Sequence, residues 1–177
     1  VILLAHPNIK ESQANKALVD AVSDMEGVAV FNLYELSQEI VFNIDEWSKI
    51  ISDASAVIYQ FPFYWMSAPS LLKKWQDEVF TFLSKTPAVA GKPLTVVTTT
   101  GSEYEAYRSG GRNRFTTDEL LRPYQVNAIH SGMSWQTPIV VYGMGTADAG
   151  KNIAEGANLY KQRVEMLIGN SNAGNNW

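Results

Sequence analysis

Hydrophobic residues along the chain fall into two kinds of segment that alternate from one end to the other. Short continuous runs of Val, Ile and Leu predict strands that are buried on both faces, at 1–5, 28–33, 56–61, 94–99 and 139–142. Longer stretches with apolar residues every three or four positions predict helices at 12–25, 45–54, 67–83 and 149–167, with a broken helical stretch at 117–129. The alternation predicts an α/β fold, a parallel sheet covered by helices on both faces.

Composition fits one domain of ordinary size, which we place at 1–169 with a polar tail at 170–177. The net charge of −4 disfavours nucleic acid as a partner, since such binding depends on cations that contact phosphates. No apolar run is long enough to cross a bilayer and no signal peptide is visible, so we expect a cytoplasmic protein. The absence of cysteine excludes thiol nucleophiles and thiolate metal sites, and we expect no metal.

The loop after the first strand carries the first candidate chemistry. A helix that begins near Ser12 directs free backbone N–H groups and the positive end of its dipole toward this loop, which suits a phosphate. His6, Ser12 and the Asn15 amide supply side-chain donors, whereas neither a Gly-rich dinucleotide fingerprint nor a Walker loop is present. The alternative is structural, with His6 as a hydrogen-bonded strand-end residue and Ser12 as a helix cap only.

Two more unusual segments follow predicted strands, at the ends where ligands bind in open α/β sheets. The aromatic run from Phe61 to Trp65 offers a flat apolar wall for a planar ring. Alternatively, Phe61 and Phe63 pack beneath the next helix while Tyr64 and Trp65 cover the sheet edge. The turn at 98–101 contains three threonines and a glycine, and the glycine lets backbone N–H groups approach a ligand.

In combination and in order, these motifs resemble one protein family over residues 1–167. The motifs are Ala5-His6-Pro7 with Ser12 and Asn15, Phe61-Pro62-Phe63-Tyr64-Trp65 with the Pro69-to-Asp77 segment, Gly91-Lys92, and Thr98 to Gly101. The sequence is similar to the flavodoxin-like NAD(P)H:quinone oxidoreductases. The similarity is to the short bacterial branch of the potassium-efflux ancillary flavoprotein and the general stress protein 14 type.

The resemblance implies a flavodoxin-like three-layer sandwich with a five-stranded parallel sheet in the order 2-1-3-4-5, and a homodimer. It implies FMN, with FAD as the alternative, and NADPH or NADH as donor. Hydride would pass through flavin N5 to a quinone-like acceptor in a ping-pong reaction. An alternative is a regulatory flavoprotein of a potassium-efflux transporter, peripheral to the inner membrane. An electron-carrying flavodoxin is disfavoured because the net charge is modest.

Site residues carry over by position in the family's motifs. The flavin phosphate is assigned to His6, Ser12, Gln13, Ala14 and Asn15, the ribityl chain and ring to Phe63, Tyr64, Trp65 and Met66, and the isoalloxazine to Thr98, Thr99, Thr100 and Gly101. The candidate catalytic residues are Tyr104 and Tyr107, in the loop where larger relatives use a Tyr and a His. This loop has no His, and His130 is expected to be structural.

Two departures bear on that site. Relatives usually show two glycines after paired threonines, whereas Thr100 takes the first of those places here, which we expect to narrow the approach to the ring. The long loop at 102–116 holds Arg108, Arg112 and Arg114. One interpretation is a solvated, mobile loop. The functional alternatives are that an arginine binds the nicotinamide dinucleotide, or that the loop closes over the flavin of the partner subunit.

Overall fold

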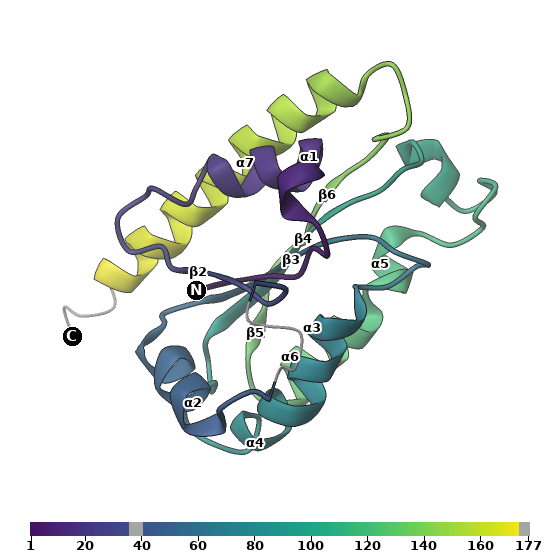
Figure 1. Ribbon diagram of the computed structural model, residues 1–177. Coiled ribbons are helices and arrows are strands. Elements are labelled where there is room, and N and C mark those ends of the chain that lie inside the picture. Colours follow the sequence, from purple (N-terminus) through teal and green to yellow (C-terminus); the bar gives the residue numbers. More distant parts are fainter. Residues whose placement is uncertain (36–40, 174–177) are drawn as a thin grey trace.

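The structure, a computed structural model, describes residues 1–35 and 41–173 and has one parallel sheet between two layers of helices (Figure 1). The sheet is built from strands that are short and mostly buried. They are β1 (Ile2–Leu4), β2 (Val30–Asn32), β3 (Val57–Pro62), β4 (Pro93–Thr99), β5 (Ser134–Trp135) and β6 (Ile139–Val141). Their order is β2-β1-β3-β4-β5, with β6 also paired to β4, and every pairing is parallel. The predicted flavodoxin-like class and strand order are confirmed.

The fifth position in the sheet is shared by two short strands. Ser134 of β5 pairs with Pro93 at the start of β4, and Val141 of β6 pairs with Thr99 at its end. Pro138 lies between the two pieces and has no N–H to give to the ladder. The sequence pattern identified only the second piece, because Ser134 and Trp135 do not form an apolar run.

The helices divide between the two faces of the sheet. Figure 1 shows α1 (Gln13–Asp20) and α7 (Ala149–Ala173) on one face. The other face carries α2 (Ile44–Asp53), α3 (Ser70–Trp75), α4 (Thr81–Leu83), α5 (Thr117–Leu120) and α6 (Arg122–His130). Shorter 3-10 turns lie at Ile9–Glu11 and Tyr104–Tyr107. The broken helical stretch predicted at 117–129 is confirmed as α5 and α6.

Three predicted helix boundaries differ from the structure. The helix predicted at 12–25 ends at Asp20 and is followed by turns. The helix predicted from residue 67 begins only at Ser70, after Pro69, and a π-helical turn at Gln76–Phe80 interrupts it between α3 and α4. Apolar spacing does not distinguish a π turn from an α turn, so the hydrophobic pattern could not predict this interruption. The last helix runs to Ala173 rather than ending near Leu167. Tail residues 174–177 lie outside the described part of the chain.

Each face of the sheet has its own core. Alternate side chains of β3 point to opposite faces, so Tyr59 and Phe61 join one cluster and Ile58 joins the other. The cluster beneath α3 is aromatic. The ring centres of Trp75 and Tyr59 lie 6.1 Å apart, and those of Phe61 and Tyr124 lie 5.3 Å apart. The cluster beneath α1 and α7 is mainly aliphatic. None of the described helices is both long enough and apolar enough to span a membrane.

Helix α7 packs closely on β6 at Gly156, and a substitution there tests this packing. An added Cβ there would lie 2.4 Å from Cγ2 of the buried and stiff Val141 side chain. We expect Gly156→Ala to lower the free energy of unfolding by about 1–3 kcal/mol, although alanine is the better helix former. The measurement is the free energy of unfolding from urea denaturation.

Gly169→Ala in the same helix is the matched control, because an added Cβ at Gly169 meets nothing within 4 Å. This variant should be as stable as the parent protein or slightly more stable. Equal stability of the two alanine variants would contradict the packing argument.

Candidate functional site

Three loops meet at the edge of the sheet where β1, β3 and β4 end, next to the N-terminus of α1 (Figure 1). Backbone and side-chain bonds hold them together. The Phe63 N–H donates to the Thr99 carbonyl (2.9 Å), and Asn15 Nδ2 donates to Thr99 Oγ1 (3.0 Å). The segments that the sequence singled out after these three strands are therefore neighbours in space.

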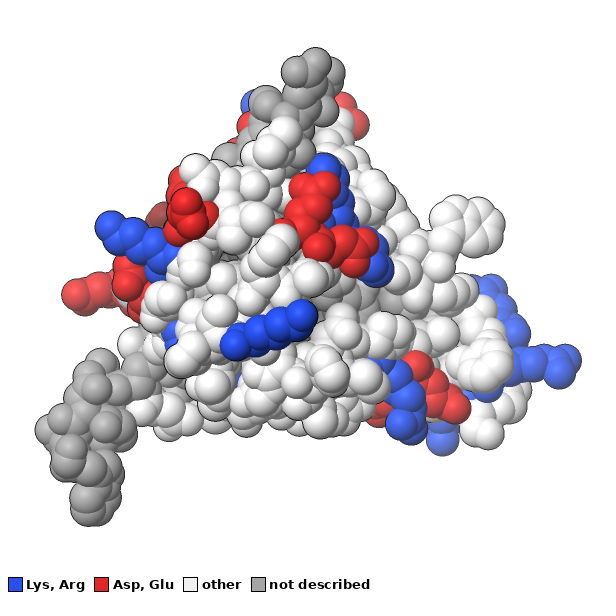
Figure 2. Space-filling model, turned by 90° about the horizontal axis from the view of Figure 1, so that it is seen from below, with Lys and Arg blue, Asp and Glu red and all other residues white. Residues whose placement is uncertain are grey.

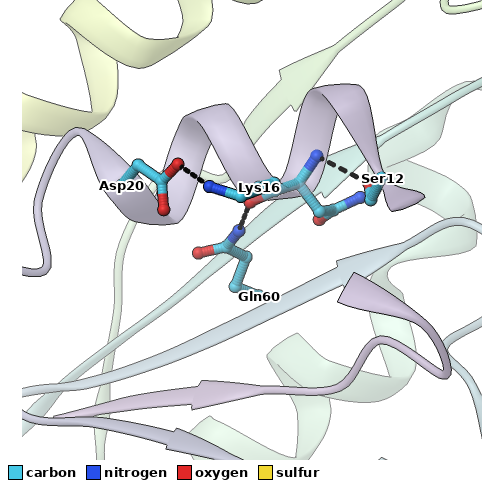
Figure 3. Close-up of polar contacts among 5 residues, drawn as sticks. Ser12, Lys16, Asp20 and Gln60 are labelled. Atoms are coloured by element: carbon cyan, nitrogen blue, oxygen red, sulfur yellow. Dashed lines mark hydrogen bonds and ion pairs between the residues drawn. The ribbon is translucent and has the colours of Figure 1, made fainter. Parts of the chain in front are cut away.

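The N-terminus of α1 is capped and tied to the sheet. Ser12 Oγ accepts a hydrogen bond from the Asn15 N–H (3.1 Å), so the expected capping role is present. Figure 3 shows Gln60 reaching from β3 to the helix, where its Nε2 donates to the Asn15 carbonyl (2.8 Å). Lys16 and Asp20 form an ion pair on the outer face of the same helix. The first turn of α1 is thereby fixed relative to the strand ends.

The Asn15 side chain is buried yet only partly satisfied. It is 1% exposed, and no donor in the described part of the chain reaches its Oδ1 atom. If the amide is turned over, Thr99 Oγ1 donates to its oxygen, and the NH₂ group becomes the free end. In either orientation one end of a buried amide lacks a partner, which is costly unless a ligand or water completes it. A buried amide with one unpaired end fits a polar ligand that binds at the helix N-terminus.

His6 is held at the end of β1 as an uncharged donor. Its ring is 8% exposed, and Nδ1 accepts a hydrogen bond from the Asn8 N–H (3.1 Å). In the neutral ring, this bond places the proton on Nε2. Burial lowers the pKa of His6, so the neutral form prevails at pH 7. The structural interpretation is thus correct for Nδ1, while Nε2–H is left to donate elsewhere.

The loop after β3 presents its aromatic side chains to the outside. The backbones of Tyr64 and Ser67 bond to each other (2.8 and 3.0 Å) and enclose Trp65 and Met66, whose φ angles are +47° and +63°. A positive φ in residues other than glycine costs on the order of 1 kcal/mol each. Trp65 is 98% exposed and Tyr64 47%. Phe61 is fully buried, as the structural alternative required, and the centre of the Tyr64 ring lies 6.5 Å from that of the His6 ring at the end of β1, whereas Trp65 extends into solvent.

Threonine hydroxyls shape the turn after β4. Thr98 Oγ1 donates to the Phe61 carbonyl (2.8 Å), and Thr100 Oγ1 donates to the Ser102 carbonyl (2.8 Å). Because the Thr100 side chain is buried and turned inward, the expected narrowing of the approach is not seen. An added Cβ at Gly101 would meet nothing within 4 Å, so the space beside Gly101 is open.

A second loop supports this turn and was missed by the sequence analysis. The backbone N–H groups of Gly143, Met144 and Gly145 donate to the carbonyls of Ser102 (2.8 Å), Thr100 (2.9 Å) and Gly101 (2.9 Å). An added Cβ at Gly145 would lie 3.1 Å from the Gly101 carbonyl oxygen. The position of residues 143–145, directly after a predicted strand, was the signal that would have identified them.

The two candidate catalytic tyrosines differ in their surroundings. Tyr107 is 5% exposed, and its ring lies between Phe63 (6.2 Å) and Tyr142 (5.9 Å). Tyr104 is 50% exposed and lies 5.3 Å from Tyr142, a residue that the sequence analysis also missed. Burial raises the pKa of Tyr142, although its hydrogen bond with Thr117 (2.6 Å) opposes the shift. Only Tyr104 of the pair is free to meet a ligand from solvent.

The arginines of the long loop occupy different places. The Arg108 guanidinium lies 5.5 Å from the centre of the Tyr104 ring. Arg112 donates to Ser102 Oγ and lies 3.9 Å from a carboxylate oxygen of Glu103. Within residues 1–35 and 41–173, no group of three or more His, Cys, Asp or Glu comes together as a metal site would require.

Comparison with known proteins places the whole chain in one family. A family model described as a flavodoxin-like fold matches residues 1–164. General stress protein 14 of Bacillus subtilis (strain 168) is 34% identical over 170 residues, which are 94% of this chain and 97% of the relative. The glutathione-regulated potassium-efflux system ancillary protein KefG of Serratia proteamaculans (strain 568) is 36% identical over 146 residues, 80% of each chain.

Solved structures agree with these sequence matches. General stress protein 14 of Treponema denticola, in complex with FMN, has a TM-score of 0.85 and is 29% identical, covering 94% of this chain and 97% of its own. An NADPH-quinone reductase from P. pentosaceus has a TM-score of 0.77 and is 27% identical, covering 92% and 95%. The resemblance found in the sequence motifs is confirmed: the chain belongs to the flavodoxin-like family of NAD(P)H oxidoreductases that includes general stress protein 14.

Proposed function

We propose that this oxidoreductase binds FMN at the strand-end site and transfers two electrons from NAD(P)H to quinones or similar acceptors. The observation that carries the proposal is the half-satisfied Asn15 amide, buried at the open N-terminus of α1 beside the free space at Gly101. The FMN bound in the Treponema denticola relative supports the choice of cofactor. FMN is preferred to FAD because the loops after β1 and β3 are short.

The residues present fit a flavin phosphate at the helix N-terminus. His6 Nε2–H, the Ser12 hydroxyl and the backbone N–H groups of Gln13 and Ala14 would hold the phosphate. The neutral imidazole donates without carrying charge, so the dipole of α1 and the hydrogen bonds provide the attraction. The Asn15 amide would bond to the phosphate or to a ribityl hydroxyl.

The remaining loops would hold the ring system and the reacting partners. The half-buried Phe63 ring and the exposed Tyr64, Trp65 and Met66 side chains would line the ribityl chain and the isoalloxazine. The Thr100 N–H donates to the Val141 carbonyl (2.9 Å), so of the two expected backbone donors the Gly101 N–H is the one that would stabilise negative charge on the reduced ring. Thr98 and Thr99 would act by fixing the backbone. Bound FMN supplies hydride chemistry through N5, and a ping-pong order lets the nicotinamide leave before the acceptor enters.

The two tyrosines take different roles in this proposal. Tyr104 is exposed and is the one placed to donate its phenolic proton to a bound acceptor. Tyr107 is buried between Phe63 and Tyr142 and acts as a positioning residue that shapes the wall of the site. We place the protein in the cytoplasm as a homodimer, following the family resemblance.

The visible spectrum tests the function directly. We expect the protein to retain a yellow flavin band after incubation with FMN and gel filtration. Anaerobic NADPH should bleach this band, and a quinone such as menadione should restore it. Parallel titrations with NADH measure the donor preference. Loss of all flavin on the column would refute the site assignment.

A variant at His6 tests the phosphate contact. We expect His6→Asn to raise the Kd for FMN about tenfold or more, because a hydrogen bond to a charged group contributes about 1.5–3 kcal/mol. Quenching of FMN fluorescence on binding gives the Kd. His130→Asn is the matched control, since His130 is exposed at the end of α6. Equal affinities of the two variants, both folded by circular dichroism, would remove His6 from the site.

A second candidate function is regulation of a membrane transporter, supported by the likeness to KefG, an ancillary protein of a potassium-efflux system. An exposed apolar patch outside the strand-end edge favours it. Val126 and Ile129 are more than half exposed on α6, and Val126 lines a groove together with Phe80 and Arg122. On the face drawn in Figure 2, acidic side chains are interspersed with basic ones. An electron-carrying flavodoxin would need a continuous acidic surface, and this face does not provide one.

Co-purification with a potassium-efflux transporter expressed in membranes tests this candidate. We expect retention of the protein by the transporter and loss of retention in Val126→Glu. Asn158→Glu, on the exposed side of α7, adds the same charge elsewhere and should be retained. If the Val126 variant is still retained by the transporter but sediments as a monomer in ultracentrifugation, the patch is a contact between two copies of the chain. The transporter proposal then fails.

A further inference from the structure

A second cavity lies at the open edge of the sheet, beyond β6. Its volume is about 640 Å³, which is in the range of small-molecule sites. It is lined by β6, by the segment from Tyr104 to Ser109, by the start of α5 and by α7. Figure 1 shows α7 and α5 on opposite sides of this edge, and residues of both helices line the cavity. None of the residues assigned to the flavin phosphate lines it.

Tyrosine rings form one wall of this edge cavity. The centres of the Tyr142 and Tyr104 rings lie 5.3 Å apart, and the ring planes meet at 79°, almost edge to face. The centres of the Tyr142 and Tyr107 rings lie 5.9 Å apart, with the ring planes at 49°. The Tyr107 ring also contacts Phe63 on the side of the strand-end site. Tyr107 therefore lies between the edge cavity and the proposed flavin site, and both candidate catalytic tyrosines, Tyr104 and Tyr107, line the cavity.

The opposite wall is an uncovered stripe of α7. Leu159, Gln162, Arg163 and Met166 follow one another at helical spacing and line the cavity. Leu159 is 56% exposed and Met166 45%. The neighbouring stripe that contains Tyr160 packs on the sheet and is buried. A flat apolar ligand placed here would contact a thioether and an aliphatic side chain on one side and tyrosine rings on the other.

The charge of the lining favours an anion. Arg108 and Arg163 contribute two guanidinium groups, and Asp118 is the sole carboxylate among the lining residues. Across the described residues, neither arginine forms an ion pair. Arg163 uses Nη1 for the Thr137 carbonyl (2.7 Å), which leaves its other donors free. Unpaired guanidinium groups beside rings suit carboxylate, sulfonate or phosphate oxygens.

We propose that the edge cavity binds a planar aromatic molecule that carries an anionic group. Rings supply the flat contacts and the two arginines supply the counter-charge. Two kinds of ligand combine a planar ring with an anionic group: the adenosine 2′-phosphate end of NADPH, and a separate aromatic acid. The site lies next to the Tyr107 wall, so its ligand would lie one ring away from the proposed reaction centre.

Calorimetric titration of two probes into the FMN-treated protein tests the site. The probes are adenosine 2′,5′-bisphosphate and naphthalene-2-sulfonate, and we expect at least one to bind with a Kd below about 1 mM. Gln162→Lys should tighten binding and Gln162→Glu should weaken it, each about threefold, because both change only the local charge. Arg108→Gln should weaken binding about fivefold or more. Lys161→Gln, on the same helix but outside the cavity, should have no effect.

The outcomes separate the two kinds of ligand from each other and from the flavin site. Preference for the bisphosphate assigns the cavity to the NADPH adenosine end, and preference for the sulfonate assigns it to an aromatic acid. Binding that is lost in His6→Asn, or unchanged in the Gln162 and Arg108 variants, would overturn the proposal, as would no binding of either probe. The titration works equally on protein that retains no flavin, so failure of the FMN proposal is distinguished from failure of this one.

Discussion

The site depends on a buried polar link between the first helix and the sheet. Asn15 bonds to Thr99 on β4, and Gln60 on β3 bonds to the Asn15 carbonyl. These side chains are almost fully buried, so each bond forms in a low dielectric where an unpaired group is costly. The link fixes the N-terminus of α1 against two strand ends, and this is the place where a phosphate would be held.

The aromatic core beneath the other face gives the loops a rigid base. Trp75 contacts Trp47, Tyr59 and Phe80, which joins α2, β3 and the π-helical turn into one packed cluster. The loop after β3 emerges from this cluster with Trp65 and Met66 at positive φ. A strained turn of this kind persists where the surrounding structure determines its conformation, and it keeps the exposed rings beside the strand ends.

Tyr107 sets the relation between the two candidate sites. Its ring contacts Phe63 on one side and Tyr142 on the other, so one buried side chain is shared by the proposed flavin site and the edge cavity. The 3-10 turn that carries Tyr107 is held by close backbone packing at Gly111, where an added Cβ would lie 2.2 Å from the Glu105 carbonyl oxygen. A ligand in the edge cavity would therefore lie one ring away from the proposed flavin site.

The sequence by itself determined the alternation of strands and helices, the parallel sheet and the three strand-end segments, because apolar periodicity is a local pattern. The strand order came from the family resemblance. It also indicated Ser12 as a cap, which rests on a contact three residues away. Only the tertiary structure decided that Thr100 turns inward, that residues 143–145 support the turn at Gly101, and that an edge cavity exists. The support of the turn by residues 143–145 and the edge cavity arise from contacts between segments far apart in the chain, and no local pattern of residues encodes which segments meet there. The Thr100 hydroxyl bonds only two residues away, but its burial depends on the surrounding fold.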